Sequence, residues 1–250
     1  MNDILLFFVY KYEGDSKKIL SAIERKEQVD LIELQEIKEI IKDKYITLLD
    51  KNYPKEFMNV IDPPFIIFYR GDISLLNKKS LAFIGSRHNS EYGEVMVEKL
   101  VKPLAKKYVI VSGLAKGIDS LAHKCCLEND GSTIAILGHG LDYCYPSINE
   151  DLKIEIENKG LIISEYPSFM KPRKENFPKR NRLIAALSKG IVVVESKRKS
   201  GTMITVEHAL NLGKDIFCVP DQAINDSGCN YLIKMGANLV ENANDIMDLL

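Results

Sequence analysis

The chain has 250 residues, of which 46% are hydrophobic and 28% charged, and its 34 basic and 35 acidic residues leave a net charge of −1. This length suffices for one large or two small domains whose core needs no disulfide bonds. The near-neutral balance excludes a wholly basic nucleic-acid-binding protein, and no apolar run approaches the ~20 residues of a membrane span.

The cysteines and the N-terminal residues indicate the compartment. Five cysteines, an odd number without Cys-x-x-Cys spacing, suit a reducing environment in which most of them are small buried apolar residues. The apolar run at residues 4–10 is too short and lacks the basic start of a signal peptide. We therefore expect a cytoplasmic protein.

The first 45 residues are predicted to form a short helical appendage with weak packing potential. Apolar residues at helical spacing mark helices at 16–27 and 31–41. Short strands follow at 45–49 and 65–69. A second domain is expected to span residues 46–250.

From residue 81 onward, short apolar runs alternate with amphipathic segments, which is typical of a parallel sheet buried on both faces. The expected fold class is α/β: an extended Rossmann-like, doubly wound, mostly parallel sheet with helices on both faces. Strands are predicted at 81–84, 109–111, 133–137, 161–164, 191–194 and 216–219, and helices at 90–107, 118–129, 148–158, 180–187, 202–212 and 228–235.

Several turns at the ends of these strands have the composition of anion-binding sites. Gly85-Ser86-Arg87 follows one strand, and Ser112-Gly-Leu-Ala-Lys-Gly-Ile-Asp119 follows the next. Glycine lets the backbone approach an anion, Ser and backbone N–H groups donate hydrogen bonds, and Arg grips phosphate with two prongs. A tight turn with a surface arginine is the simpler alternative for the first of these.

A basic stretch lies further along the chain. Residues 171–199 hold ten Lys and Arg against two acids, Glu175 and Glu195. Such a local excess can attract a polyanion although the whole chain is near neutral. A solvated basic loop would give the same composition, but the neighbouring turns favour nucleic acid.

Other chemistry has less support. The Walker-A spacing and the G-x-G-x-x-G fingerprint are absent, so neither ATP hydrolysis nor a dinucleotide cofactor is expected. His139 has no obvious second ligand, so we assign no metal, and His123 is expected in the core or on a helix surface. Tyr143 and Tyr145 could stack on bases or pack against the sheet edge.

Taken together, the motifs occur in a characteristic order. They are Tyr53-Pro54, Asp62-Pro-Pro64, Gly85-Ser-Arg87, Ser112-Gly-x-Ala-x-Gly-Ile-Asp119 with Ala122-His123, Tyr145-Pro146, Ser164-Glu165, Phe177-Pro-x-Arg-Asn-Arg182, Ser200-Gly201-Thr202, Val219-Pro220 and Asn230-x-x-Ile233-x-x-Gly236-Ala237. Over residues 45–250 this series resembles the DNA-processing protein A family (DprA, also called Smf).

The resemblance implies an extended Rossmann fold, single-stranded DNA as ligand, a homodimer, and help in loading a RecA-type recombinase during natural transformation. It implies that Arg87, Lys116, Arg180 and Arg182 face DNA phosphates. The late segment 206–240 is a candidate dimer surface. The full set of expected DNA- or phosphate-binding residues is Gly85, Ser86, Arg87, Ser112, Gly113, Lys116, Gly117, Lys179, Arg180, Asn181, Arg182, Lys199, Ser200, Gly201 and Thr202.

Two residues depart from the family pattern. Asp221 replaces the glycine usual after the proline of the last long strand, and Cys229 replaces a threonine in the usual Gly-Thr-Asn. A carboxylate at that turn is expected to weaken anion binding locally. The helical N-terminal domain of many members is reduced here to about 45 residues.

An enzyme is the main alternative. The segment from Arg180 to Thr205 also resembles the nucleoside-monophosphate phosphoribohydrolase (LOG) family, whose catalytic glutamate aligns with Thr205. A hydroxyl cannot replace that carboxylate, and Glu207 lies elsewhere on the helix. We therefore expect a non-enzymatic DNA-binding protein without cofactor, with a nucleotide hydrolase or a small-nucleotide sensor as alternatives.

Overall fold

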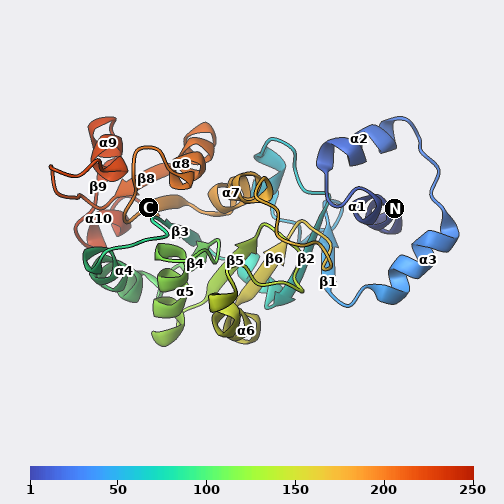
Figure 1. The fold of residues 1–250 in the computed structure, drawn as a ribbon, viewed down its shortest axis with the longest axis horizontal. Helices are drawn as coiled ribbons and strands as arrows, with labels where there is room; N and C mark the ends of the chain where they lie inside the picture. Colours follow the sequence, from blue (N-terminus) through green and yellow to red (C-terminus); the bar gives the residue numbers. More distant parts are fainter.

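A single nine-stranded sheet runs through the molecule in the computed structural model, which describes residues 1–250 (Figure 1). Its order is β1-β2-β6-β5-β4-β3-β7-β8-β9. The strands are β1 Lys44–Thr47, β2 Ile66–Gly71, β3 Ser80–Ile84, β4 Val109–Ser112, β5 Thr133–Leu137, β6 Leu161–Ser164, β7 Gly190–Val193, β8 Asp215–Cys218 and β9 Asn238–Leu239.

The sheet is mostly parallel, as the sequence predicts. Only β2 runs antiparallel to its neighbours β1 and β6. The chain winds outward from β3 to β6 and then returns to place β7 on the other side of β3. The order of winding therefore reverses between β3 and β7, which is where doubly wound sheets commonly bind their ligands.

Helices cover both faces of the sheet. They are α1 Asn2–Lys11, α2 Ser16–Glu24, α3 Leu31–Ile40, α4 Glu91–Leu104, α5 Ile118–Glu128, α6 Glu150–Lys159, α7 Asn176–Leu187, α8 Gly201–Asn211, α9 Gly228–Lys234 and α10 Asn244–Met247, with 3₁₀ turns η1 Lys55–Asn59, η2 Ile73–Asn77 and η3 Ser147–Asn149. None of the helices is long and apolar enough to cross a membrane.

Strand periodicity sorts the apolar side chains between the two faces. In β3, Ala82 and Ile84 join the core that packs against α7, α8 and α9. Leu81 and Phe83 join the core formed with α4, α5 and α10. All four are buried, because alternate residues of a strand point to opposite faces and helices cover both.

Helix α7 begins earlier than the sequence analysis predicts. It starts at Asn176, four residues before Arg180, and includes Pro178 in its first turn. Proline is tolerated there because the first N–H groups of a helix have no partner within it. Arg180 and Arg182 consequently lie inside the helix rather than at its N-terminus.

The N-terminal segment packs more tightly than its sequence suggests. Helix α1 was not predicted, yet Phe7 and Phe8 are buried in a core shared with Phe68 of β2 and Ile162 of β6. Figure 1 shows α1–α3 grouped at the β1 end of the sheet, with α8–α10 at the opposite end. The apolar run at residues 4–10 is therefore a helix packed into the core, which the sequence analysis did not predict.

Candidate nucleic-acid interface

A cavity of about 810 Å³ opens at the carboxyl ends of β3 and β7, where the winding reverses. The turn after β3 and the segment between β7 and α8 form two of its sides, and α7 forms a third. This volume falls within the range of ~300–1,000 Å³ typical of ligand sites. The first turn of α8 also lines it, and the Ser200 side chain does not cap that helix.

Close backbone contacts fix the turns around this cavity. The Ile118 N–H donates to the carbonyl oxygen of Ser86 at 3.1 Å, and the Thr202 hydroxyl donates to that of Gly85 at 3.1 Å. Gly117 has a φ of +85°, and a Cβ there would stand 2.2 Å from the Ser86 oxygen. Only glycine therefore allows the two strand-end turns to meet.

Arg180 forms the floor of the cavity rather than an exposed phosphate clamp. It is 4% exposed, and its Nη1 donates to the carbonyl oxygen of Gly113 at 2.8 Å and to that of Ile136. Burial lowers the pKa of Arg180 to about 10, although the buried Asp119 opposes this shift. Its Nη2 makes no hydrogen bond within the protein and is the part left for a ligand.

The exposed cations at the cavity are Arg87, Lys197 and Lys199, none of which forms an ion pair. The lining carboxylates, in contrast, already have partners. Glu195 accepts from the N–H and the hydroxyl of Ser90, both at 2.9 Å. Among the others, the Asp119 carboxylate accepts from the Gly113 N–H, that of Asp221 from the Gln222 N–H and Asn225, and that of Asp226 pairs with Arg198. Of these four carboxylates only Asp226 forms an ion pair, so the lining carries as many carboxylates as cations, and the exposed side chains of Arg87, Lys197 and Lys199 are the groups free to turn to an anion.

Asp221 lines this cavity, whereas Cys229 is buried behind it and its thiol donates to the carbonyl oxygen of Val193. Of the two departures from the family pattern, only Asp221 is positioned to affect an anion.

Arg182 does not face this cavity, contrary to expectation. Its Nη1 and Nη2 make a two-pronged ion pair with Glu165 at 2.7 and 2.6 Å, and Nη2 also donates to the carbonyl oxygen of Asp62. Its remaining donors go to the Ile61 and Lys179 carbonyl oxygens. These contacts use the hydrogen-bonding capacity of the guanidinium inside the protein.

The structure brings together nine of the fifteen predicted site residues and separates six. Those lining the cavity are Gly85, Ser86, Arg87, Arg180, Asn181, Lys199, Ser200, Gly201 and Thr202. Those outside its lining are Ser112, Gly113, Lys116, Gly117, Lys179 and Arg182. Ser112, Gly113 and Gly117 are buried beneath the site, whereas Lys116 is exposed beside the lining residue Ala115.

An aromatic pair stands at one side of the cavity. Phe177 lines it, and the ring of Tyr145 lies 5.3 Å away at an interplanar angle of 33°. Tyr145 is 52% exposed, whereas Tyr143 is only partly exposed. Tyr145 is therefore the better placed of the two tyrosines to stack on a base.

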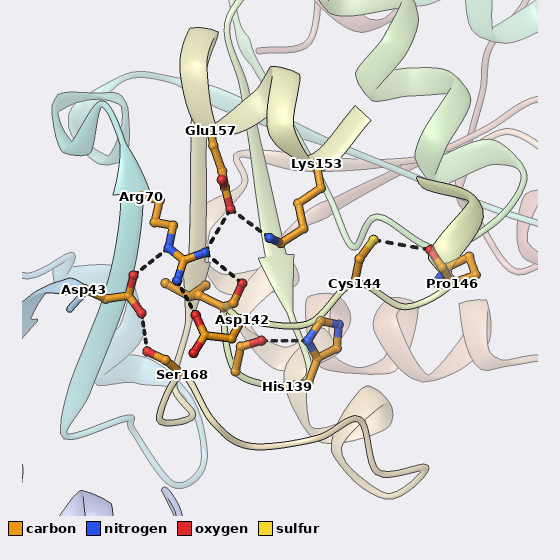
Figure 2. A network of polar contacts seen from close by, with 11 residues as sticks. Asp43, Arg70, His139, Asp142, Cys144, Pro146, Lys153, Glu157 and Ser168 are labelled. Carbon is orange, nitrogen blue, oxygen red and sulfur yellow. Dashed lines mark hydrogen bonds and ion pairs between the residues drawn. The ribbon is translucent and has the colours of Figure 1, made fainter. Parts of the chain in front are cut away.

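A polar network holds the loop that carries Tyr145 (Figure 2). Arg70 of β2 contacts Asp43, Asp142 and Glu157 at 2.5, 2.6 and 3.5 Å, and it also donates to the Leu141 carbonyl oxygen. These partners come from three separate segments of the chain. The network thus ties the loop after β5 to β2 and α6.

The position that aligns with the catalytic glutamate of the related hydrolases carries no carboxylate. Thr205, at the position of the hydrolase glutamate, is buried in its lining, whereas Glu207 is exposed and outside it. No three His, Cys, Asp or Glu side chains cluster as a metal site would require. His123 is a core residue hydrogen-bonded to Thr133 at 2.6 Å, and burial lowers its pKa to about 3.

Fifteen of the 24 lining residues were not among the predicted site residues, and three of them show why. Lys197 stands in the same basic run as Lys199, and Phe177 opens the Phe-Pro-x-Arg-Asn-Arg series that is part of the family resemblance, so both carried a signal. Asn225 belongs to a loop after β8 that only the folded chain brings to the site.

Comparison with known proteins confirms the resemblance found in the sequence. Residues 44–250 match the family described as DNA recombination-mediator protein A. The DNA processing protein DprA of Streptococcus pneumoniae is 42% identical over 227 residues, covering 90% of this chain and 80% of that protein.

Solved structures agree. The crystal structure of S. pneumoniae DprA has a TM-score of 0.84 and 38% identity, covering 99% of this chain and 93% of that one. DprA from Helicobacter pylori, described for its single-stranded DNA binding mode, has a TM-score of 0.76 and 34% identity, covering 83% of this chain and 95% of that one.

Proposed function

This chain belongs to the DNA recombination-mediator protein A family, and from this premise we propose that it binds single-stranded DNA in the cavity between β3 and β7. The observation that carries the proposal is the set of exposed cations Arg87, Lys197 and Lys199, beside carboxylates that other groups already engage. The uncapped N-terminus of α8 adds backbone donors suited to a phosphate oxygen. The H. pylori relative is described as binding the same class of ligand.

Binding is proposed to depend on the backbone more than on base sequence. The cations contact phosphates, and the Tyr145–Phe177 pair offers a stacking surface that any base can use. Each phosphate contact on a single strand contributes about 0.7 to the slope of log affinity against log salt. Four to six contacts would therefore give a slope of about −3 to −4.

We further propose that the bound strand is passed to a RecA-type recombinase in the cytoplasm, in transformation or in general recombination. The family description as a recombination mediator supports this role. A homodimer would join two DNA sites and raise avidity. Exposed apolar side chains in the segment expected to dimerise support that assembly, namely Leu210, Tyr231, Met235 and Leu239.

The role is proposed to be binding without turnover. Thr205 occupies the position of the hydrolase glutamate, and Asp119 is buried and accepts from the Gly113 N–H. Desolvation raises the pKa of Asp119, but Arg180 opposes that shift. Incubation with nucleoside monophosphates should release no free base; steady release would favour the hydrolase instead.

The deciding experiment measures binding of a fluorescent dT strand of ~30 nucleotides across a salt series. Wild type is compared with Arg87→Ala/Lys199→Ala, which removes two exposed cations from the cavity. The variant should bind more weakly, with a salt slope shallower by about 1.4.

The control is Lys106→Ala/Lys107→Ala. It removes the same charge from two exposed lysines between α4 and β4, at the amino ends of the parallel strands and so opposite the cavity. Equal slopes for wild type and both variants, or no binding by wild type at low salt, would overturn the proposal.

A further inference from the structure

A second cavity, of about 590 Å³, lies between the N-terminal segment and the Rossmann-like domain. Its lining includes the start of α2, the loop before β2, the segment after β6, and α7 with α8. Figure 1 shows α2 and α7 on the same side of the sheet, with the chain before β2 between them. Two of the residues expected to bind DNA, Lys179 and Arg182, line this cavity.

The two cavities lie on opposite sides of α7 and share two lining residues, Pro178 and Ile204. Within α7 the helical period divides the side chains, since positions three or four apart share a face. Arg180 and Asn181 line the first cavity, whereas Lys179 and Arg182 line the second. On this helix a ridge made by a single exposed residue, Pro178, therefore separates the two cavities.

The second cavity is rich in both charges, but most of its acids are engaged. Glu165 is held by Arg182, and Glu13 pairs with Arg173 at 2.7 Å. Asp15 accepts from the N–H of Lys18 to cap α2.

The cations of the second cavity have fewer close partners than its acids. Lys179 is exposed and forms no ion pair. Lys17 approaches Asp62, and Lys18 approaches Asp15, only at 3.8 Å with exposed side chains, and such surface pairs are weak. Three lysines can therefore turn to an anion, while among the lining acids Glu175 has no partner and Asp62 has only its weak pair with Lys17.

We propose that a DNA strand leaving the first cavity crosses the Pro178–Ile204 ridge and continues into the second, where Lys179, Lys17 and Lys18 contact its phosphates. This inference rests on the proposed function of the first cavity and extends it. The N-terminal segment then forms part of the DNA interface and sets the length of strand that each chain covers.

The test compares strand lengths, using dT strands of ~6 and ~30 nucleotides. Lys17→Ala/Lys18→Ala removes two exposed lysines outside the first cavity, and alanine at both positions is compatible with helix α2. The short strand should bind with the wild-type affinity and salt slope, because the first cavity holds it. The long strand should bind more weakly, with a slope shallower by about 1.4.

Lys106→Ala/Lys107→Ala again serves as the charge-matched control and should behave as wild type with both strands. An unchanged long-strand slope in Lys17→Ala/Lys18→Ala would overturn the continuation while leaving the first cavity standing. Equal weakening of short and long strands would also overturn it, because the lysines would then affect the binding of any strand rather than contact only the part that extends into the second cavity. Failure of wild type to bind either strand would instead contradict the proposed function.

Discussion

Two arginines only two residues apart have different roles in this chain. Arg182 forms a buried two-pronged pair with Glu165 and holds the loop before β2 through the Ile61 and Asp62 carbonyl oxygens. Arg180 holds carbonyl oxygens at the ends of β4 and β5 and is the buried cation that faces Asp119. Both guanidinium groups therefore serve first to hold parts of the fold together, and only second to bind a ligand.

Arg180→Met should lower the free energy of unfolding by about 3–5 kcal/mol, because it leaves the buried carboxylate of Asp119 without its countercharge. Adding Asp119→Asn should recover part of the loss, since a neutral amide needs no countercharge. Urea unfolding of both single variants and the double variant measures this coupling. Arg87→Met, at an exposed position, should leave stability unchanged. Additive losses in the double variant would contradict the proposed electrostatic role.

At the scale of elements, the positions of β3–β8 in the chain were predictable from the sequence, whereas the faces of α7 were not. Each buried strand is a continuous apolar run, so the predicted strands agree with β3–β8 to within one residue. Helix α7 was predicted to begin at Arg180, which placed residues 179–182 together at a helix N-terminus. Beginning it at Asn176 divides them by helical period between two cavities.

The meeting of two strand-end turns could be anticipated only in part. The glycines of both turns are suited to an anion by their sequence, but no sequence pattern indicates that Gly117 touches the Ser86 backbone. Such a contact joins residues about 30 apart and depends on the packing of α5 against β3. Glycine here serves the approach of backbone to backbone.

Gly117→Ala should therefore destabilise the protein by more than the ~1–2 kcal/mol of a residue forced to positive φ. Its Cβ would stand 2.2 Å from the Ser86 oxygen, so the turn carrying Arg87 must move and DNA affinity should fall. Gly213→Ala is the matched control: its φ is +66°, but no atom lies within 4 Å of the added Cβ. Thermal unfolding and DNA titration of both variants check this. Equal effects would show that backbone strain alone matters.

At the scale of the whole molecule, the N-terminal segment is joined to the sheet by apolar and polar contacts. Helix α1 shares a core with β2, β5 and β6, and Tyr10 packs edge-on against Phe68 at 6.1 Å. The pairs Arg173–Glu13 and Lys17–Asp62 link it to the loops around the second cavity. Helix α1 could not be predicted from the sequence, because the apolar run at 4–10 lacks the polar face that marks a surface helix.

These contacts predict that the N-terminal segment unfolds together with the rest of the chain. Phe7 is fully buried, so Phe7→Ala should cost about 3–5 kcal/mol and lower the temperature of a single unfolding transition. Ile4→Ala, at a 43% exposed position of the same helix, is the control and should shift it little. Circular dichroism reports the helices, and the fluorescence of the 11 tyrosines reports tertiary packing. A separate early transition for Phe7→Ala, with the main one unmoved, would instead make residues 1–45 an independent appendage, and the second cavity would then lack a fixed wall.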